Sequence, residues 1–381
     1  MCASRAAFTR FLLALTTTLS ATLAAPAMAQ FAPGFYAYEP GNFRWAVTGI
    51  SDDGTTVTGF TRDVNSPAIN GYTIQASGVQ HFPEVSKAYD ASDHGAYTVG
   101  YATRRAADGT TQTLIGNAQP ENTYGGAHIS GDGQTVAGIA EFEFDGSVTA
   151  VSSWRWTASG GVTQLNPYRP NALITRATNI SRDGSTIVGT GSDSVFGDVT
   201  EAWMWREGLG YTILPDAPGA RWVEAEARAV NGDGTIVVGK GNDSIGNIHA
   251  LIWRNGVPTA LPAPASFESV TAHAVSDDGT IIAGVLSDPL TSAPETGAAW
   301  TPENGWVPLL DYIRSQGIDV PSYYGPVGQL VMSGDGRTFA GVSIDSRSGL
   351  LVSFVASVPT PGATVLMVMF GVIAGQAHAR R

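Results

Sequence analysis

A nine-residue segment that occurs seven times constrains the fold of this chain more than any other feature. Its clearest copy is residues 181–189, and the other copies begin at Ser51, Ser92, Ser130, Asn231, Ser276 and Ser333. In every copy one glycine is followed five residues later by a second: 54/59, 95/100, 133/138, 184/189, 234/239, 279/284 and 336/341. The first glycines of successive copies are 38 to 57 residues apart. A period of this size predicts a propeller or a solenoid.

Each copy has the pattern of a β-hairpin, because an apolar residue precedes it and a β-branched run such as residues 235–238 follows. Six of the first glycines follow an aspartate, and His94 takes that place in the second copy. We expect the glycine to adopt the left-handed conformation at the end of a type I turn, and the aspartate to bind turn amides. Calcium ligation and acid catalysis are the functional alternatives. Recurrence at one turn position favours the structural role, since calcium needs several oxygen ligands.

The better preserved units contain four strand segments, which in the fifth unit are residues 225–230, 235–238, 249–253 and 257–261. Small residues alternate on the first segment, as expected beside a crowded axis, and the tryptophan of the third, Trp253, is expected to pack between units. The last unit lacks a fourth segment before Pro359, and we expect residues 31–42, with 35–38 as the candidate strand, to supply it. Residues 309–316 are expected to form a short helix that ends at Gly317. The sequence therefore predicts an all-β fold, a seven-bladed β-propeller of four-stranded antiparallel blades, over residues 30–357.

The two ends of the chain predict export. Residues 1–29 have the pattern of a secretory signal helix, with two arginines, an apolar run and a small-x-small site that signal peptidase would cleave between Ala29 and Gln30. The only cysteine, Cys2, lies in this leader, so the mature protein is expected to contain no disulfide. Residues 358–381 hold a Pro-rich break, an apolar run over 363–375 and two final arginines. We expect a C-terminal apolar helix with transient membrane contact and the arginines on the cytoplasmic side; a buried core helix is the alternative.

The net charge is −12, and it becomes −16 when the four arginines of the two terminal segments are left out. Such a body repels phosphate backbones, so nucleic acid is excluded as a partner.

The tail resembles the PEP-CTERM sorting signal, whose pattern of Val-Pro-x-Pro, apolar helix and basic end is matched by Val358, Pro359, Pro361, Arg380 and Arg381. Thr360 stands where that family usually has Glu, and the basic end has only two arginines. The resemblance implies a Gram-negative bacterium, an exosortase-type sorting enzyme as partner, and delivery to the cell surface or extracellular matrix.

Residues 43–357 resemble the extracellular HAF repeat proteins, through residues 274–284 and the Ala-aromatic-x-Trp strand over 202–205. That family has no established chemistry, so the resemblance implies no catalytic residues.

No enzyme motif stands out, and we predict no catalytic residue, metal site or cofactor. The six histidines show no His-Glu-x-x-His spacing, and no Gly-x-Ser-x-Gly occurs. In this repeat Gly directly follows Asp, unlike the Asp-box of sialidase propellers. His128 and His273 lie on first strands and could meet near the axis, although a role in the core is favoured. Glu141, Glu143 and Asp145 are interpreted as a solvated face.

We expect long loops to share one face and to carry the function, over residues 60–71, 101–112, 140–151, 190–201, 215–224, 262–270 and 307–328. The candidate ligand-binding residues are Tyr168, Arg169, Trp222, Phe267, Tyr323 and Tyr324, for each of which packing against neighbouring loops is the competing interpretation. The sequence thus favours a non-catalytic binding scaffold, with extracellular polysaccharide as the candidate ligand. The alternatives are a polysaccharide hydrolase or lyase, and a structural coat protein.

Overall fold

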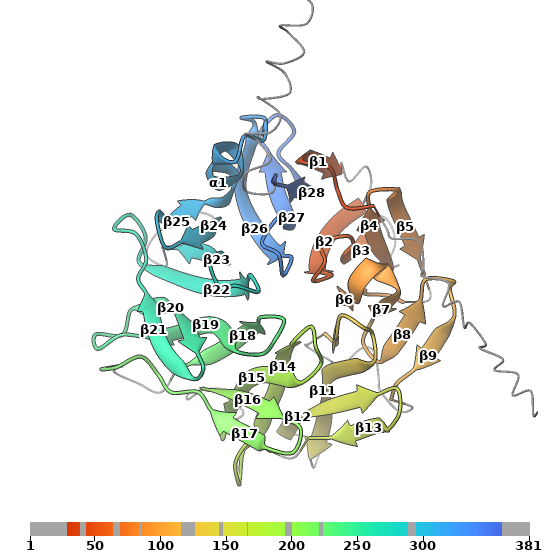
Figure 1. Ribbon diagram of the computed structural model, residues 1–381, viewed down its shortest axis with the longest axis vertical. Coiled ribbons are helices and arrows are strands. Elements are labelled where there is room, and N and C mark those ends of the chain that lie inside the picture. Colours follow the sequence, from red (N-terminus) through yellow and green to blue (C-terminus); the bar gives the residue numbers. More distant parts are fainter. Residues whose placement is uncertain are drawn as a thin grey trace, which may run out of the picture.

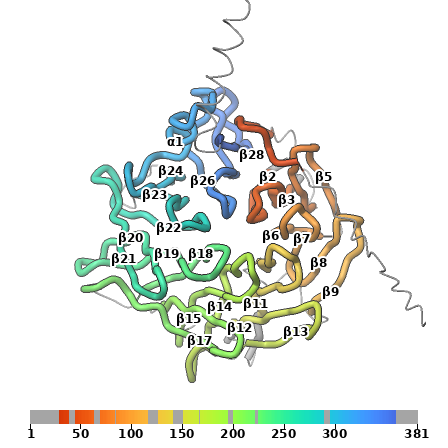
Figure 2. Tube along the Cα trace, viewed as in Figure 1, coloured from red at the N-terminus to blue at the C-terminus, as the bar shows by residue number. Residues whose placement is uncertain are grey.

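The computed structural model describes residues 29–38, 43–63, 69–83, 85–115, 126–144, 148–165, 167–194, 200–220, 224–288 and 295–359. Their strands form sheets arranged around one central axis, as Figure 1 shows face-on and the Cα trace in Figure 2 repeats. Neighbouring strands within each four-stranded unit are antiparallel. The prediction of an all-β, propeller-like fold is confirmed.

Each four-stranded unit, called a blade below, is numbered in chain order, and its first strand is the innermost. Blade 1 holds β2 (Phe43–Ile50), β3 (Val57–Asp63), β4 (Ile69–Gln75) and β5 (Gly78–Phe82), and blade 2 holds β6 (Asp90–Ala91), β7 (Tyr97–Val99), β8 (Thr103–Ala106) and β9 (Thr111–Thr113). Blade 3 holds β10 (His128–Ile129), β11 (Thr135–Phe144), β12 (Val148–Thr157) and β13 (Gly161–Gln164), and blade 4 holds β14 (Ile174–Ile180), β15 (Thr186–Ser192), β16 (Glu201–Arg206) and β17 (Gly210–Ile213).

Three further blades complete the ring. Blade 5 holds β18 (Glu226–Val230), β19 (Ile236–Asn242), β20 (Ile248–Arg254) and β21 (Val257–Leu261), and blade 6 holds β22 (Ser269–Val275), β23 (Ile282–Ser287), β24 (Thr296–Thr301) and β25 (Gly305–Pro308). Blade 7 holds β26 (Tyr324–Met332), β27 (Thr338–Asp345), β28 (Leu350–Ser357) and, from the other end of the chain, β1 (Gly34–Tyr38).

Hydrogen bonding divides the described strands into five sheets of four strands and one of eight. The eight-stranded sheet consists of blades 3 and 4, which a single parallel pair, Val151 with Ile174, joins between β12 and β14. The ring therefore counts as six sheets, or as seven blades when this sheet is divided at that pair.

The first described strand closes the ring, as Figure 1 shows where β1 lies beside β28. β1 pairs antiparallel with β28 from Gly34 opposite Ser357 to Tyr38 opposite Ser353. The Phe35 ring lies 5.2 Å from the rings of both Phe354 and Tyr324. Pairing satisfies an edge that β28 would otherwise expose. The prediction that residues 31–42 supply the missing strand is confirmed.

The predicted turn is present in all seven copies, where the first glycine has φ between +62° and +74°. In the clearest copy, Asp183 Oδ1 accepts hydrogen bonds from the Ser185 amide at 2.9 Å and the Ser181 hydroxyl at 2.5 Å. Ser181 Oγ in turn accepts the Thr186 amide at 3.0 Å. The aspartate thus stabilises the turn, as the recurrence predicted. In the second copy His94 itself has a φ of 57°.

In five of the seven copies, the second glycine of the repeat lies where the backbones of strands one and two approach closely. A Cβ atom on Gly239 would lie 1.8 Å from the Glu226 carbonyl oxygen, and one on Gly59 would lie 2.1 Å from that of Ala46. The first strand has a register shift at this level, between Ala227 and Ala229 in blade 5. Only glycine leaves room for this bulged pairing.

Replacing this glycine is therefore expected to destabilise the ring. Gly239→Ala should lower the free energy of unfolding by about 3 kcal/mol, because the backbone of β18 or β19 must move to admit the methyl group. Urea denaturation measures the change. Gly328→Ala is the control, since its nearest contact is a carbonyl oxygen 4.0 Å away. Equal losses in the two variants would contradict the close-approach explanation.

Apolar side chains fill the spaces between blades. Trp253 of β20 is fully buried in a cluster with Val188 and Ala202 of blade 4, and its Nε1 donates to the Pro215 carbonyl at 2.7 Å. Trp203 of β16 packs likewise with residues of blade 3. The prediction that third-strand tryptophans pack between blades is confirmed for these two.

Some boundaries differ from the prediction. The short helix is present as α1 (Leu309–Ser315), but β11 and β12 extend through most of the predicted loop 140–151, and β8 lies inside the predicted loop 101–112. β26 begins at Tyr324, five residues earlier than predicted, because it pairs with a longer β27.

Residues 1–28 and 360–381, with most of the predicted leader and tail, lie outside the described residues. Within the described part of the chain, no helix has the length and apolar character needed to cross a membrane.

Candidate functional site

A cavity of about 480 Å³ lies on the axis of the ring. Residues from or beside all seven innermost strands form its wall, and the polar ones include Thr48, Asp90, His128, Thr178, Arg228, His273 and Gln329. Alternation along a strand lets one side chain face the axis while the next packs between blades. The inner strands therefore carry polar groups without disturbing the core.

At one mouth of this cavity the seven repeat turns are joined by hydrogen bonds, each turn to the next. We call this closed set of contacts the turn ring. The links are Asp53 N to Asp93 Oδ1 (3.3 Å), Asp93 N to Gly131 O (2.9 Å), Gly131 N to Arg182 O (2.8 Å), Asp183 N to Gly232 O (3.1 Å), Gly232 N to Asp277 Oδ1 (2.8 Å), Asp277 N to Gly334 O (2.6 Å) and Gly334 N to Asp52 O (2.9 Å). Every link uses the residue that follows the Ser or Asn of a repeat.

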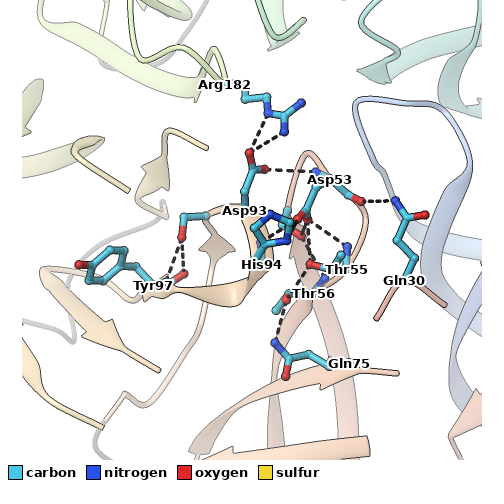
Figure 3. A network of polar contacts seen from close by, with 11 residues as sticks. Gln30, Asp53, Thr55, Thr56, Gln75, Asp93, His94, Tyr97 and Arg182 are labelled. Atoms are coloured by element: carbon cyan, nitrogen blue, oxygen red, sulfur yellow. Dashed lines mark hydrogen bonds and ion pairs between the residues drawn. The ribbon is translucent and has the colours of Figure 1, made fainter. Parts of the chain in front are cut away.

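The turn ring holds several carboxylates close to one arginine. Figure 3 shows Arg182 donating through Nε and one terminal nitrogen to Asp93 Oδ2, at 2.8 and 2.7 Å, while Asp93 also faces the Asp53 amide. Burial, followed by the negative charges of Asp90, Asp93 and Asp277, raises the pKa of Asp52 to about 8, although Arg182 opposes the shift. Asp52 is therefore protonated at neutral pH.

The two first-strand histidines both line the axial cavity, but each has its own partner. His128 Nδ1 lies 3.7 Å from Asp90 Oδ2. His273 Nε2 lies 2.9 Å from Thr271 Oγ1, and burial, with a smaller effect of Arg228, lowers the pKa of His273 to about 4. His273 is therefore a neutral hydrogen-bonding group at neutral pH.

On the opposite face, a second cavity of about 370 Å³ opens between blades 4 and 5. We call it the loop-face pocket, and its lining is Ile174, Arg176, Thr178, Thr190, Gly191, Ser192, Thr200, Glu226, Arg228 and His273. Thr178, Arg228 and His273 also line the axial cavity, so the two spaces adjoin.

Several polar groups of this pocket are buried without a hydrogen-bond partner: Nε of Arg176, Nε of Arg228 and Oγ1 of Thr200. The single carboxylate of the lining, Glu226, is already engaged, because it binds Arg228 at 2.9 Å and Lys240 at 3.1 Å. The pocket therefore offers unused donors and an excess of positive charge.

Tyr168 and Arg169 lie together beside β16. The Tyr168 hydroxyl donates to Glu201 Oε2 at 2.6 Å, and Arg169 binds Glu201 at 2.8 Å and Asp193 at 3.2 Å. Tyr168 is buried in the core between blades 3 and 4. Its ring offers no open face to a ligand, whereas Arg169 keeps about a third of its side chain exposed, 35%.

The other predicted binding residues lie in different blades. Tyr324 is buried in the core of blade 7, Phe267 packs partly buried against the core of blade 6, and the Arg347 guanidinium stacks 3.5 Å from the Tyr323 ring centre. Trp222 lies outside the described residues. Tyr323, Tyr324 and Phe267 do not form one shared surface with Tyr168 and Arg169, and ligand contact by any of the six stays a prediction.

The sequence interpretation missed Arg176, Arg228 and Thr200. Arg176 and Arg228 lie on first strands, where the alternation of small residues had directed attention to packing. The sequence signal that could have identified Arg176 and Arg228 is the presence of a charged residue on a predicted innermost strand.

Residues of the predicted processing sites are only partly described. Ala29 and Gln30 are exposed, and the Gln30 side-chain amide donates to the Asp53 carbonyl at 3.5 Å. Val358 is buried in the core of blade 7, and Pro359 is half-buried. Pro361, Arg380, Arg381 and Asp145 lie outside the described residues, as do the side chains of Glu141 and Glu143. Among the described side chains, no group of three or more His, Asp or Glu is placed to hold a metal ion.

Comparison with protein-family models finds no match, and neither does comparison with curated proteins. Solved structures are similar in fold. Oligogalacturonate lyase from Vibrio parahaemolyticus is 12% identical with a TM-score of 0.54, covering 88% of this chain and 99% of that one. An oligogalacturonate lyase in complex with manganese is 12% identical with a TM-score of 0.52, covering 88% and 98%.

TolB from Acinetobacter baumannii is 13% identical with a TM-score of 0.41; the match covers 81% of this chain, which spans 65% of the length of TolB. At such identities the likeness to the two lyase structures shows a shared β-propeller fold alone.

Proposed function

We propose that this chain is an exported, seven-bladed propeller of a Gram-negative bacterium, sorted to the cell surface or matrix, that binds extracellular polysaccharide without cleaving it. The leader and tail patterns support export through signal peptidase and an exosortase-type enzyme. The likeness of the repeats to HAF proteins fits an extracellular role.

The observation that carries the binding function is the loop-face pocket. It adjoins the axial cavity, and its buried donors have no partner within the described protein. An unsatisfied buried donor destabilises a fold, so a site that keeps several of them is suited to a ligand that accepts hydrogen bonds. Sugars, with many oxygen acceptors, meet this requirement.

The test is retention of the producing bacterium's own extracellular polysaccharide by the purified, immobilised protein, followed by an assay of the polymer for new reducing ends. We expect retention with no increase in reducing ends. Failure to retain the polymer would contradict the proposal, and cleavage would contradict its non-catalytic part.

One observation favours the second candidate, a polysaccharide hydrolase or lyase. Asp52, a carboxyl group that is neutral at pH 7, lines the axial cavity together with Asp90. Two carboxyl groups facing one space, one of them with a raised pKa, are the arrangement that acid–base cleavage of a glycosidic bond uses. In the same assay, reducing ends that appear with the wild-type protein and disappear with Asp52→Asn would favour this candidate.

A further inference from the structure

We propose that the loop-face pocket binds an anionic group of the ligand, the carboxylate or sulfate of an acidic sugar, through Arg176 and Arg228. This inference rests on the proposed binding function and specifies the chemical class of its ligand.

Arg176 gives the first argument. Its side chain lines the pocket and forms no hydrogen bond or ion pair with any residue that the structure describes, and its Nε is buried. Arg176 as a whole is only partly buried, but burying a guanidinium nitrogen without a partner is unfavourable, so such nitrogens are normally hydrogen-bonded. An anion in the pocket would supply the missing partner, and the planar guanidinium matches the geometry of a carboxylate or sulfate.

The charge balance of the pocket gives the second argument. Arg228 binds Glu226 through a terminal nitrogen and leaves its Nε unpartnered, while Lys240 takes the other oxygen of Glu226. The pocket lining thus holds two arginines and one carboxylate, and Lys240 also binds that carboxylate. The nearby Glu201 does not restore the balance, because Arg169 and Tyr168 bind it. A positive pocket stands out in a chain whose net charge is −12.

The remaining lining fits a sugar around that anion. His273 is neutral at pH 7, and the Thr200 hydroxyl is buried without a partner, so both offer uncharged hydrogen bonds. The volume of about 370 Å³ lies within the range of small-molecule sites, roughly 300–1,000 Å³. The net negative charge of the chain repels a polyphosphate more strongly than a sugar that carries one anionic group.

The direct test uses glucuronate, glucose 6-sulfate and neutral glucose as probes, titrated calorimetrically into the full-length protein. We expect an anionic probe to bind, glucose to bind at least ten-fold more weakly, and added salt to weaken the anionic probe. Arg176→Gln and Arg228→Gln should each raise the Kd about ten-fold or more, since a charge-assisted hydrogen bond is lost. The double variant should abolish binding.

The controls separate folding from recognition. Arg314→Gln removes an arginine that pairs with Asp311 on α1, outside the pocket, and should leave the Kd unchanged. Thermal melting of every variant confirms that it folds. Binding of glucuronate alone or of the sulfate alone would identify the anion. Glucose binding as tightly as both acids, or an unchanged Kd in the double variant, would overturn the inference.

The polymer assay distinguishes the two proposals. If wild type and the Arg176→Gln/Arg228→Gln variant retain the polysaccharide equally, the binding function stands and the inference is wrong. If wild type retains no polymer yet binds an anionic probe through the two arginines, polysaccharide binding is wrong and the anion site stands.

Discussion

A disulfide between residues 34 and 357 is expected to raise the free energy of unfolding by about 5 kcal/mol. Gly34 and Ser357 are direct partners in the β1–β28 pairing, a placement that suits the 4.4–6.8 Å between Cα atoms of a disulfide. The bond would close a loop of more than 300 residues in the unfolded chain, and the entropic effect grows with loop length. Small side chains at both positions limit the strain.

The measurement compares Gly34→Cys/Ser357→Cys under oxidising and reducing conditions by chemical denaturation, with Cys2→Ser as background. The two single-cysteine variants are the controls and should not respond to the reductant. If the double variant remains reduced under oxidising conditions, or unfolds at the same denaturant concentration in both states, then β1 does not close the ring in solution.

Asp52→Asn is expected to stabilise the protein at alkaline pH by about 3 kcal/mol, and to change its stability little near pH 4.5. The folded-state pKa of Asp52 is about 8, against an ordinary value of 3.8. Between these values the folded protein binds a proton that the unfolded chain does not, so stability falls as pH rises, by up to about 1.4 kcal/mol per pH unit. Asparagine stays neutral and has no such cost. Because Asp52 keeps partial contact with solvent, the expected change in the free energy of unfolding is smaller than the full pKa shift would give.

Asp53, next to Asp52 in the chain, is the control, because its pKa is shifted in the opposite direction. Burial pushes the pKa of Asp53 upward, but hydrogen bonds from Ser51, Thr55 and the His94 amide lower it overall. Its folded-state pKa is thus depressed, so Asp53 contributes stability above pH 4 that is lost as the pH falls. Asp53→Asn should therefore destabilise at pH 7 and approach wild type in acid. Parallel pH profiles of the two variants, measured by thermal melting from pH 2 to 9, would contradict both assignments.

The repeat made the architecture predictable, because its chemistry is local. Each repeat contains a glycine with positive φ and an apolar residue before the turn, and six of the seven contain an aspartate that accepts a hydrogen bond from the amide two residues later. These residues together specify one hairpin, so the number of repeats predicts the number of hairpins. The pairing of β1 with β28 was predictable for a different reason. The last unit lacked one strand, and residues 35–38 were available to supply it.

The turn ring was not predictable in the same way. Its links come from the position after the Ser or Asn, which holds Asp, Gly or Arg and shows no pattern when the copies are compared. Five of the seven links join two backbone atoms, so the sequence leaves little trace of them, and only Asp93 and Asp277 accept through a side chain. The elevated pKa of Asp52 likewise depends on carboxylates 38, 41 and 225 residues away in the chain, at Asp90, Asp93 and Asp277.

The loop-face pocket was missed because its charged residues lie on strands and not in loops. Searching the loops for aromatic platforms selected Tyr168 and Tyr324, whose large rings the fold uses in its core. Arg176 and Arg228 come together only because blades 4 and 5 adjoin, and the residues between them in the chain do not indicate that contact.

The closure of blade 7 by both ends of the chain also sets the order in which the ring can form. β1 is synthesised first among the strands, but its partner β28 is the last, so β1 must wait while the six other blades and most of blade 7 emerge. Contacts between residues so distant in sequence form slowly, because a long loop must close before they are gained. We therefore expect blade 7 to be the final part of the protein to fold. Until then the nascent chain carries two unpaired strand edges, β1 and later β28, that are open to pairing with other chains.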